Sequence, residues 1–496
     1  MPSEERLHPV SILFSFGKSL RAFALPGLVG LVIAARRPGP NADAWMMLFL
    51  IPAAAAAIFR YLSFRMRYEG TELVIRSGFI FRNERHIPYA RIQNLDAVQN
   101  VFHRLLRVIE VRIQTGAGAE PEATISVLPA SALDEMRRRV FGRELRAETA
   151  PRTNERVLLQ MPLRELLLHG FLVNRGMVVI GALYGILWQL DLLDRVWAPF
   201  FDRGVDEEEV RGLFEAIASG ARVSLTQIAV AAGAVAGFLI VVRIASMAWA
   251  VVRLYGFRVT EVGDDLRIEY GLLTRFTATI PVRRIQSVTI TEGPLYRLAD
   301  RVSVRVETAG GRAGQESAAS VREWLAPLLR PAQLGPLLAD VMREEPAPLD
   351  WTGAHPRAFR RAVKRRVFLA TVLTLVAGIA LGWRGLLVGV VAIPWSVLAA
   401  RRYVDHLGWM ASGSMVAFRS GWLWRSVTIA RISRIQAVTL IESPFDRRTA
   451  MARVRVDTAG ASERSHRIDI PYLARDGAAA LQSRLAAQAA DTEFQW

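Results

Sequence analysis

Six long apolar runs divide the chain, and they occur in pairs. They lie at residues 22–35 and 44–59, at about 171–190 and 224–248, and at 367–383 and 386–400. A membrane-spanning helix needs about 20 mostly apolar residues, so each pair predicts a transmembrane helical hairpin. The first run has only 14 residues and follows a basic segment, which also describes a signal peptide. The second run follows it at once, and this favours a hairpin.

Between the hairpins the pattern changes to short segments in which apolar and polar residues alternate. This alternation, interrupted by turn residues, predicts small antiparallel β domains. A closing helix is expected in each domain, at residues 131–146, about 320–343 and about 473–488. The predicted division is an N-terminal segment with an interfacial or pre-membrane helix and hairpin 1 (1–61), β domain 1 (62–150), a linker and hairpin 2 (151–254), β domain 2 (255–345), a linker and hairpin 3 (346–402), and β domain 3 (403–496).

A short motif recurs at the same place in each β domain. Its three copies are Arg91-Ile92-Gln93, Arg284-Ile285-Gln286 and Arg434-Ile435-Gln436. A glycine precedes each copy, and an alternating segment that ends in threonine follows it. The glycines are Gly78, Gly271 and Gly421, and the threonines are Thr115, Thr308 and Thr458. Because the spacing from motif to threonine contains no gap, the chain holds a threefold internal repeat.

The motif can be interpreted as a ligand site or as part of the fold. Its arginines could hold a lipid phosphate through bidentate hydrogen bonds. Strand alternation, if no bulge shifts it, places Arg284, Gln286 and Val288 on one face. A glutamine among apolar residues suits a half-buried amide that satisfies backbone groups. We therefore predict a structural role for the motif residues Arg91, Gln93, Arg284, Gln286, Arg434 and Gln436.

The charge of the chain points to an anionic partner. Its formal net charge is +17, while 52% of its residues are hydrophobic. The basic residues flank the apolar runs instead of forming one stripe, which favours a membrane surface and disfavours nucleic acid. The loop at 191–222 holds eight acidic and four basic residues. The positive-inside rule therefore places that loop outside and the β domains and both termini in the cytoplasm. The arginines near the membrane, candidates for lipid-headgroup contact, are Arg65, Arg67, Arg82 and Arg85.

The sequence shows no signature of catalysis. The chain has no cysteine, and its seven histidines share no ligand spacing. It contains no Walker loop, nucleophile elbow or zinc-protease motif. The apolar runs contain no carboxylate, which argues against an ion-coupled transporter. We therefore expect no enzyme activity, catalytic residue, cofactor or metal.

Several of these features together resemble the YdbS/YdbT family of bacterial membrane proteins, in particular its longer members. The resemblance rests on the glycine turn, on the run from Ile87-Pro88 to Gln93 and its copies, and on the strands at 304–310 and 454–460. It implies pleckstrin-homology (PH)-like domains, each a bent antiparallel β-sandwich or barrel capped by a C-terminal helix. Two departures stand out. Arg431 replaces the proline found at Pro88 and Pro281, and Gly116 directly follows Thr115.

The expected function is that of a non-enzymatic, multi-pass protein of the bacterial inner membrane. Its three cytoplasmic PH-like domains would scaffold an assembly or bind a partner protein or anionic headgroups. The alternative is a component of a transport or export system. The expected partners are membrane lipids, a membrane protein of the same family, or a second copy of the chain.

Overall fold

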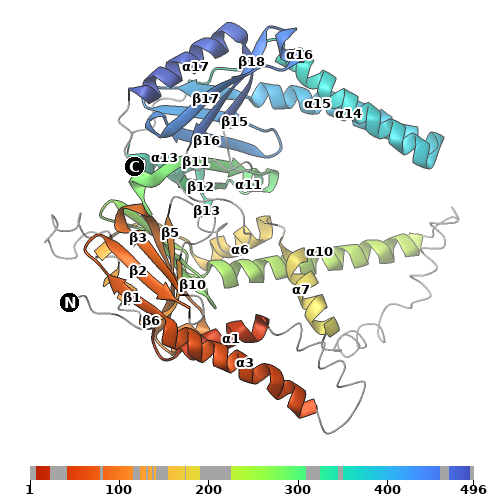
Figure 1. Ribbon diagram of the computed structural model, residues 1–496. Helices are drawn as coiled ribbons and strands as arrows, with labels where there is room; N and C mark the ends of the chain where they lie inside the picture. Colours follow the sequence, from red (N-terminus) through yellow and green to blue (C-terminus); the bar gives the residue numbers. More distant parts are fainter. Residues whose placement is uncertain are drawn as a thin grey trace. The chain divides into compact units, whose positions relative to one another are not determined.

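The computed structural model places most of the chain (Figure 1). It describes residues 7–22, 42–78, 82–115, 123–129, 132–133, 135–136, 139–140, 155–173, 175–189, 225–308, 324–343, 350–458 and 468–491. The chain forms two compact units. The first comprises Met1–Leu159, Val259–Glu269 and Thr274–Trp496, and the second comprises Gln160–Arg258 and Tyr270–Leu273.

The first β domain consists of two three-stranded antiparallel meanders. The first meander is β1 (Arg65–Tyr68), β2 (Glu72–Ser77) and β3 (Asn83–Pro88). After the 3₁₀ turn η1 (Tyr89–Arg91), the second meander is β4 (Ile92–Gln99), β5 (Val108–Thr115) and β6 (Ala123–Pro129), with the short helix α4 (Val101–Leu105) between β4 and β5. Two such sheets around one core agree with the PH-like fold.

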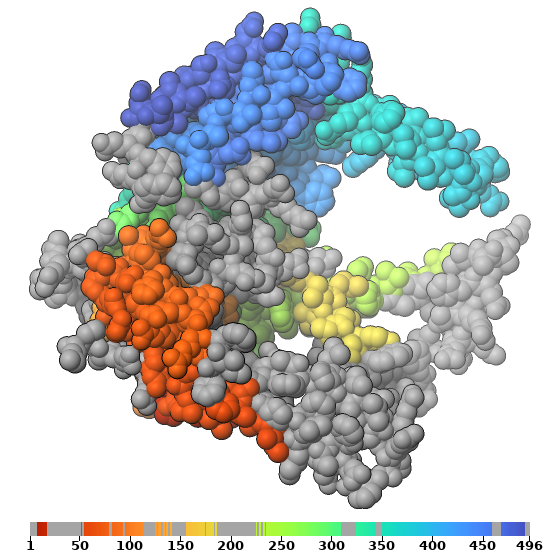
Figure 2. Space-filling view, viewed as in Figure 1, coloured from red at the N-terminus to blue at the C-terminus, as the bar shows by residue number. Residues whose placement is uncertain are grey.

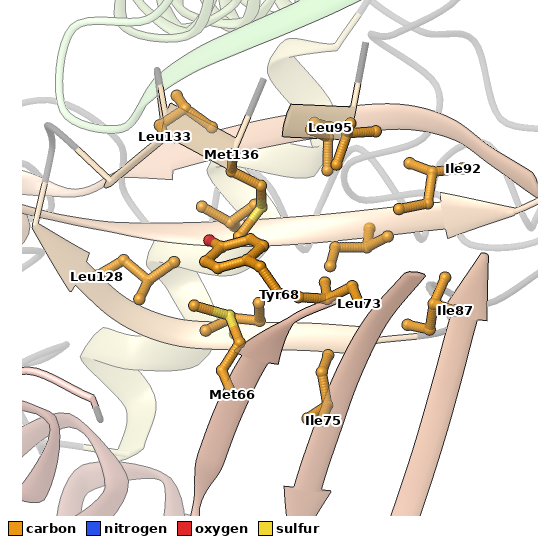
Figure 3. Close-up of a cluster of buried hydrophobic side chains, with 14 of the residues drawn as sticks. Met66, Tyr68, Leu73, Ile75, Ile87, Ile92, Leu95, Leu128, Leu133 and Met136 are labelled. Atoms are coloured by element: carbon orange, nitrogen blue, oxygen red, sulfur yellow. The ribbon is translucent and has the colours of Figure 1, made fainter. Parts of the chain in front are cut away.

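The core of this domain lies between the two meanders (Figure 3). Met66, Tyr68 and Leu73 from the first meander meet Ile92 and Leu95 from the second. The helical residues Leu133, Met136 and Val140 close the same core, where the sequence predicts the capping helix. Burying each large apolar side chain contributes about 1.5–3 kcal/mol, so this cluster is a large stabilising contribution to the domain.

The N-terminal segment is docked on the first β domain. Leu7 belongs to the core, and the backbone N–H of His8 donates to the carbonyl of Val127 at 3.3 Å. The helix α1 (Ser11–Ala22) follows, and its Phe14 stacks on the buried ring of His103 with centroids 4.0 Å apart. The predicted interfacial helix is therefore held by a protein surface.

The second and third β domains repeat this plan. The second contains β7 (Glu155–Gln160), β8 (Arg258–Val262), β9 (Asp265–Tyr270), β10 (Arg275–Pro281), η2 (Val282–Arg284), β11 (Ile285–Glu292), α11 (Pro294–Leu298), β12 (Val302–Thr308), β13 (Trp324–Leu329) and α13 (Leu334–Met342). The third contains β14 (Gly408–Ala411), β15 (Met415–Ser420), β16 (Arg425–Arg431), η4 (Ile432–Arg434), β17 (Ile435–Ile441), α16 (Pro444–Arg447), β18 (Met451–Thr458), β19 (Ile468–Ala474) and α17 (Arg475–Ala490).

Two elements of these domains differ from the sequence expectation. The region of the predicted helix at about 320–343 contains the strand β13, all six of whose residues are buried, and its described α-helical part is Leu334–Met342, after a 3₁₀ turn at Pro331–Gln333. The strand β7 lies in the region expected to be a linker, and it pairs beside β8 in the sheet. Likewise Thr352, before hairpin 3, exchanges two backbone hydrogen bonds of 2.9 Å with Trp409 after it. The chain thus contacts each of these domains before it enters the hairpin.

The three repeated glycines occupy equivalent turns between the second and third strands of each first meander. Gly78, Gly271 and Gly421 have φ of 97°, 112° and 88°, a backbone region that favours glycine. A Cβ on Gly421 would lie 1.8 Å from the carbonyl oxygen of Trp424. These glycines are therefore required by the turns.

Among the residues that the structure describes, two helices are long and apolar enough to cross a membrane, namely Val235–Leu254 and Trp383–His406. The first lies in α10 (Leu225–Leu254), and the second is α15. A third candidate is the pair Leu163–Leu172 (α6) and Gly176–Ala182 of α7 (Gly176–Gln189), bent by 84°. The helix α3 (Ala42–Ser63) matches the second apolar run. The first apolar run and the acidic loop lie outside the described residues.

Hairpin 3 is an antiparallel pair of helices, α14 (Ala358–Leu381) and α15 (Trp383–His406), which projects from the β domain that follows it (Figure 2). The pair packs closely at small residues. A Cβ on Gly385 would lie 2.0 Å from the carbonyl oxygen of Ala377, and one on Gly389 would lie 2.8 Å from Cγ2 of Thr374. Close backbone approach of this kind is a main source of helix association in lipid.

We expect Gly385→Ala to loosen hairpin 3. The new methyl group must push the two helices apart, and overpacking of this kind costs about 1–3 kcal/mol. Thermal unfolding of the purified protein in detergent measures the effect. Gly233→Ala in α10 is the control, because a Cβ there meets nothing within 4 Å. Equal midpoints for the two variants would contradict the packing described.

Candidate functional site

The β domains are joined to each other by strand pairing. β4 of the first domain pairs antiparallel with β10 of the second, which produces a seven-stranded sheet in the order β6-β5-β4-β10-β9-β8-β7. β11 of the second domain pairs with β16 of the third, which produces a six-stranded sheet in the order β13-β12-β11-β16-β15-β14 (Figure 1). We call these contacts joint 1 and joint 2.

The two joints use the same register. In joint 1, Ala97 lies opposite Thr277. In joint 2, the residues at the same repeat positions, Ile290 and Val427, lie opposite each other. The two remaining pairs of joint 1 also have equivalents in joint 2. The pair Val98↔Phe276 of joint 1 corresponds to Thr291↔Ser426 of joint 2. The pair Gln99↔Arg275 corresponds to Glu292↔Arg425. The joint is therefore a property of the repeat.

A repeated arginine connects two copies of the motif. Arg284 lies at the end of the 3₁₀ turn η2, and its guanidinium donates to the carbonyl of Ile92 at 2.9 Å. The acceptor belongs to the motif of the preceding domain. A hydrogen bond from a charged donor contributes about 1.5–3 kcal/mol. The contact is consistent with a structural role, although that role stays a prediction.

The strand phase deduced from the sequence is wrong at the motif, because each copy contains a β-bulge. In the second copy Ile285 faces Thr308 while Ser287 faces Glu307, which leaves Gln286 as the extra residue. The same shift follows Ile92 and Ile435. Ile285 therefore joins Val288 in the core, with 1% and 0% of their surfaces exposed.

The repeated glutamines differ between the copies. Gln286 is 4% exposed, and its Nε2 donates to the carbonyl of Arg284 at 3.3 Å. Gln436 is exposed in the third domain. The side chain of Gln93 lies outside the described residues. In the two copies that can be compared, the glutamine is buried where the domain forms a joint through that strand and exposed where it does not.

Joint 2 is reinforced by side chains. The hydroxyls of Thr289 and Thr428 lie 3.2 Å apart across it, and Glu292 lies 3.7 Å from Arg425. Arg297 of α11 donates to the carbonyls of Trp422 and Leu423, at 2.9 and 3.2 Å, in the turn between β15 and β16. Thr289 is fully buried as a result.

The departure of Arg431 from the repeat has a structural explanation. A proline at this position has no side chain that can donate, whereas Arg431 donates to the carbonyls of Val341 and Met342 at 3.2 and 2.8 Å. These carbonyls end α13, where the helix dipole favours a cation. Arg431 thus fastens the capping helix of the second domain to the third domain.

We expect Arg431→Gln to weaken this attachment, because it removes a charged donor from two helix-terminal carbonyls. The loss should be about 1.5–3 kcal/mol. It should appear as a lower thermal midpoint and as faster proteolysis between the second and third domains. Arg448→Gln, an exposed arginine of the same domain, is the control. Equal proteolysis of the two variants would contradict the assignment.

The four headgroup candidates do not form one site. The guanidinium of Arg65 donates to the carbonyls of Leu62 and Phe64, at 2.9 and 3.0 Å, and so closes the end of α3. Arg67 forms an ion pair with Glu69. Arg82 and Arg85 are exposed. Headgroup contact by these four stays a prediction.

The structure brings Arg65 and Arg67 beside Arg76 around a small hollow. Arg85 pairs with Ile75 in the strand register and therefore lies on the other face of the sheet. Acidic groups balance much of this charge. The hydrogen bond from Arg76 to Glu84, whose ion pair is 2.8 Å long, lowers the pKa of Glu84.

Other cations, at the base of hairpin 3, are more available. They are exposed at the first turns of α14 and near the end of α15, beside the third β domain. The set is Arg360, Lys364, Arg365, Arg401 and Arg402. The sequence reasoning used them only for orientation. Their position at the two ends of one predicted hairpin was the signal that they lie together.

Two observations bear on the other functional classes. Arg243 in α10 donates to the carbonyl of Phe171 at 3.1 Å, with its guanidinium 5.5 Å from the Phe171 ring, so this charge serves helix packing. Within the described ranges no group of three or more His, Asp or Glu residues could hold a metal ion.

Comparison with known proteins identifies the domains. The bacterial PH domain family model matches the chain three times, at residues 20–144, 216–329 and 365–489. The UPF0699 transmembrane protein YdbT of Bacillus subtilis (strain 168) is 22% identical over 493 residues, which span 93% of this chain and 94% of that protein. No solved structure matches. The chain therefore belongs to the bacterial PH domain family and is a transmembrane protein with three copies of that domain.

Proposed function

We propose that this protein is a non-enzymatic scaffold of the bacterial inner membrane, in which strand pairing joins the three PH domains into one array. The equal register of joints 1 and 2 carries this proposal. A repeated domain that binds ligands independently has no need of a fixed register to its neighbour. A scaffold needs it, because its partners must meet the domains at fixed spacing.

The use of the repeated residues supports a role without catalysis. The glycines form turns, the arginine of the second motif bonds to the neighbouring domain, and the isoleucines fill cores. Folding thus explains the glycines and the isoleucines, and contact between domains explains the arginine of the second copy. Residues of an active site would instead converge on a reacting centre.

The membrane part of the proposal has six spans as three hairpins. Two helices meet the length and composition of a span, and the bent pair α6–α7 provides a third. We assign α14 to the membrane because it packs along α15. The cations at the base of hairpin 3 then lie at the cytoplasmic surface, where each contributes about 1 kcal/mol of attraction to anionic lipid. Headgroup contact by these residues would hold the array against the bilayer.

Cysteine accessibility tests this arrangement. The chain has no cysteine, so single substitutions report one position each. We expect a membrane-impermeant maleimide to label Asp206→Cys on intact spheroplasts. Leu105→Cys, Leu298→Cys and Arg448→Cys, one exposed position in each β domain, should react only after permeabilisation. Labelling of any β domain from outside would overturn the proposed orientation.

A further inference from the structure

The strand β17 is an open edge at the position where the other two domains form joints. In the repeat it is equivalent to β4 and β11, which pair with β10 and β16. In the described part of the chain β17 pairs with β18 alone, and it ends the sheet β17-β18-β19. The third domain therefore presents the joint surface without the strand that covers it elsewhere.

Exposure of side chains follows this difference. Ile290 in joint 2 is 9% exposed, whereas its equivalent Leu440 is 36% exposed. Leu295 and its equivalent Phe445 are 38% and 59% exposed. Arg447 is exposed, whereas its equivalent Arg297 is half-buried against the next domain. The open surface thus comprises β17 and α16, and it is more apolar than an edge in solvent should be.

An edge strand that stays unpaired normally carries protective features. Charged side chains, prolines or bulges along the edge prevent pairing with another chain. From Ile435 to Ile441, β17 has no charged residue and no proline, and its bulge lies at its first residues. This composition is typical of a strand whose edge is paired with another strand.

The same chain contains the matching strand, also open. β3 of the first domain is equivalent to β10 and β16, and it pairs only with β2 among the described residues. Four of its residues, Asn83 to His86, are exposed. Among the described residues, therefore, β17 of the last domain and β3 of the first both lack a partner strand on their outer edge, although Gln482 of α17 donates to the carbonyl of Val438 at 3.4 Å.

We propose that β17 of one chain pairs with β3 of a second copy, in the register of joints 1 and 2. This inference rests on the proposed scaffold function and names its self-assembly site. The register aligns Thr439 with Arg85, as Thr289 aligns with Thr428. It also sets Glu442 opposite Arg82, where joint 2 has Glu292 opposite Arg425. The Glu–Arg pair of joint 2 is thus kept in the new joint, whereas Glu84, Arg85 and His86 stand where joint 2 has the uncharged Val427, Thr428 and Ile429.

The contact is heterologous, because β17 and β3 are different surfaces. Each added copy leaves one open β17 and one open β3. Pairing therefore extends into a row or closes into a ring of copies, with all PH domains on one side of the membrane.

Disulfide trapping in native membranes tests the proposal. Chains carrying Thr439→Cys and differently tagged chains carrying Arg85→Cys are expressed together and oxidised. We expect a disulfide-linked dimer that contains both tags. The double variant Thr439→Cys/Arg85→Cys should give a ladder of higher oligomers. Thr439→Cys with Glu84→Cys is the register control, since adjacent residues on a strand face opposite ways.

Each outcome of the disulfide experiment either supports or contradicts pairing of β17 with β3. The intrachain pair Thr289→Cys/Thr428→Cys serves as the reference for joint 2. If this reference oxidises and the tagged chains do not link, the new joint is wrong while the scaffold stands. If the reference pair does not form a disulfide either, the result contradicts the proposed scaffold function as well. A link formed only within one chain, or equal linking by the register control, also overturns pairing with a second copy.

Discussion

Thr289→Lys is expected to destabilise the protein by about 3 kcal/mol, because it places an ammonium without a counter-ion in a closed joint. Thr289 is fully buried. Its neighbours across the strands are Thr428 on one side and Arg305 on the other, so no carboxylate faces it directly. If the second and third β domains unfold together, a loss of this size lowers their thermal midpoint by roughly 6–12 °C.

Thr439→Lys is the matched control. Thr439 is the same residue type at the same repeat position, opposite Arg455 as Thr289 is opposite Arg305. It is exposed, and among the described residues β18 is the one strand that pairs with β17. In dilute detergent, where copies are separated, we expect a change below about 0.5 kcal/mol. Equal midpoint shifts in the two variants would show that joint 2 does not bury Thr289.

Ile240→Arg is expected to reduce membrane insertion several-fold. Ile240 lies near the middle of α10 and is 59% exposed, so in water its replacement would cost almost nothing. In the bilayer, an arginine near the centre of a helix costs about 2.5–3.5 kcal/mol. The measurement is the fraction of protein that resists alkaline extraction from membranes.

Two further arginine substitutions serve as comparisons for Ile240→Arg, one outside the predicted membrane helices and one in α14. Leu298→Arg, 86% exposed in α11 of the second β domain, should leave insertion unchanged. Leu375→Arg, 56% exposed in α14, should behave like Ile240→Arg if α14 also crosses the membrane. An Ile240→Arg variant that inserts as well as Leu298→Arg would contradict a transmembrane α10.

The repeat made much of the fold predictable. The glycines at 78, 271 and 421 marked the hairpin turns, and alternation marked most strands. The bulge was not predictable, because it changes the phase of a strand without any residue type that signals it. The strand β13 was missed for a related reason. Its six apolar residues, Trp324–Leu329, fit a buried helix as well as a buried strand.

The candidate site was less predictable, because a joint between domains leaves almost no local signal. Thr289 and Thr439 look alike in the sequence, and only the pairing of β11 with β16 separates them. Arg431 was recognised as a departure from the repeat, but its use depends on where α13 ends. The headgroup candidates were chosen for nearness to the membrane. That criterion could not show that Arg65 and Arg67 are already engaged.

Cleavage of a trapped joint 2 tests the strand-paired array most directly. Thr289→Cys and Thr428→Cys are introduced together, because their hydroxyls lie 3.2 Å apart. A specific protease site is inserted at residues 344–349, between the second domain and hairpin 3. After oxidation and cleavage in membranes, the two fragments should migrate as one species without reductant and separate when it is added. Fragments that separate without reductant would contradict the joining of the PH domains by β11 and β16.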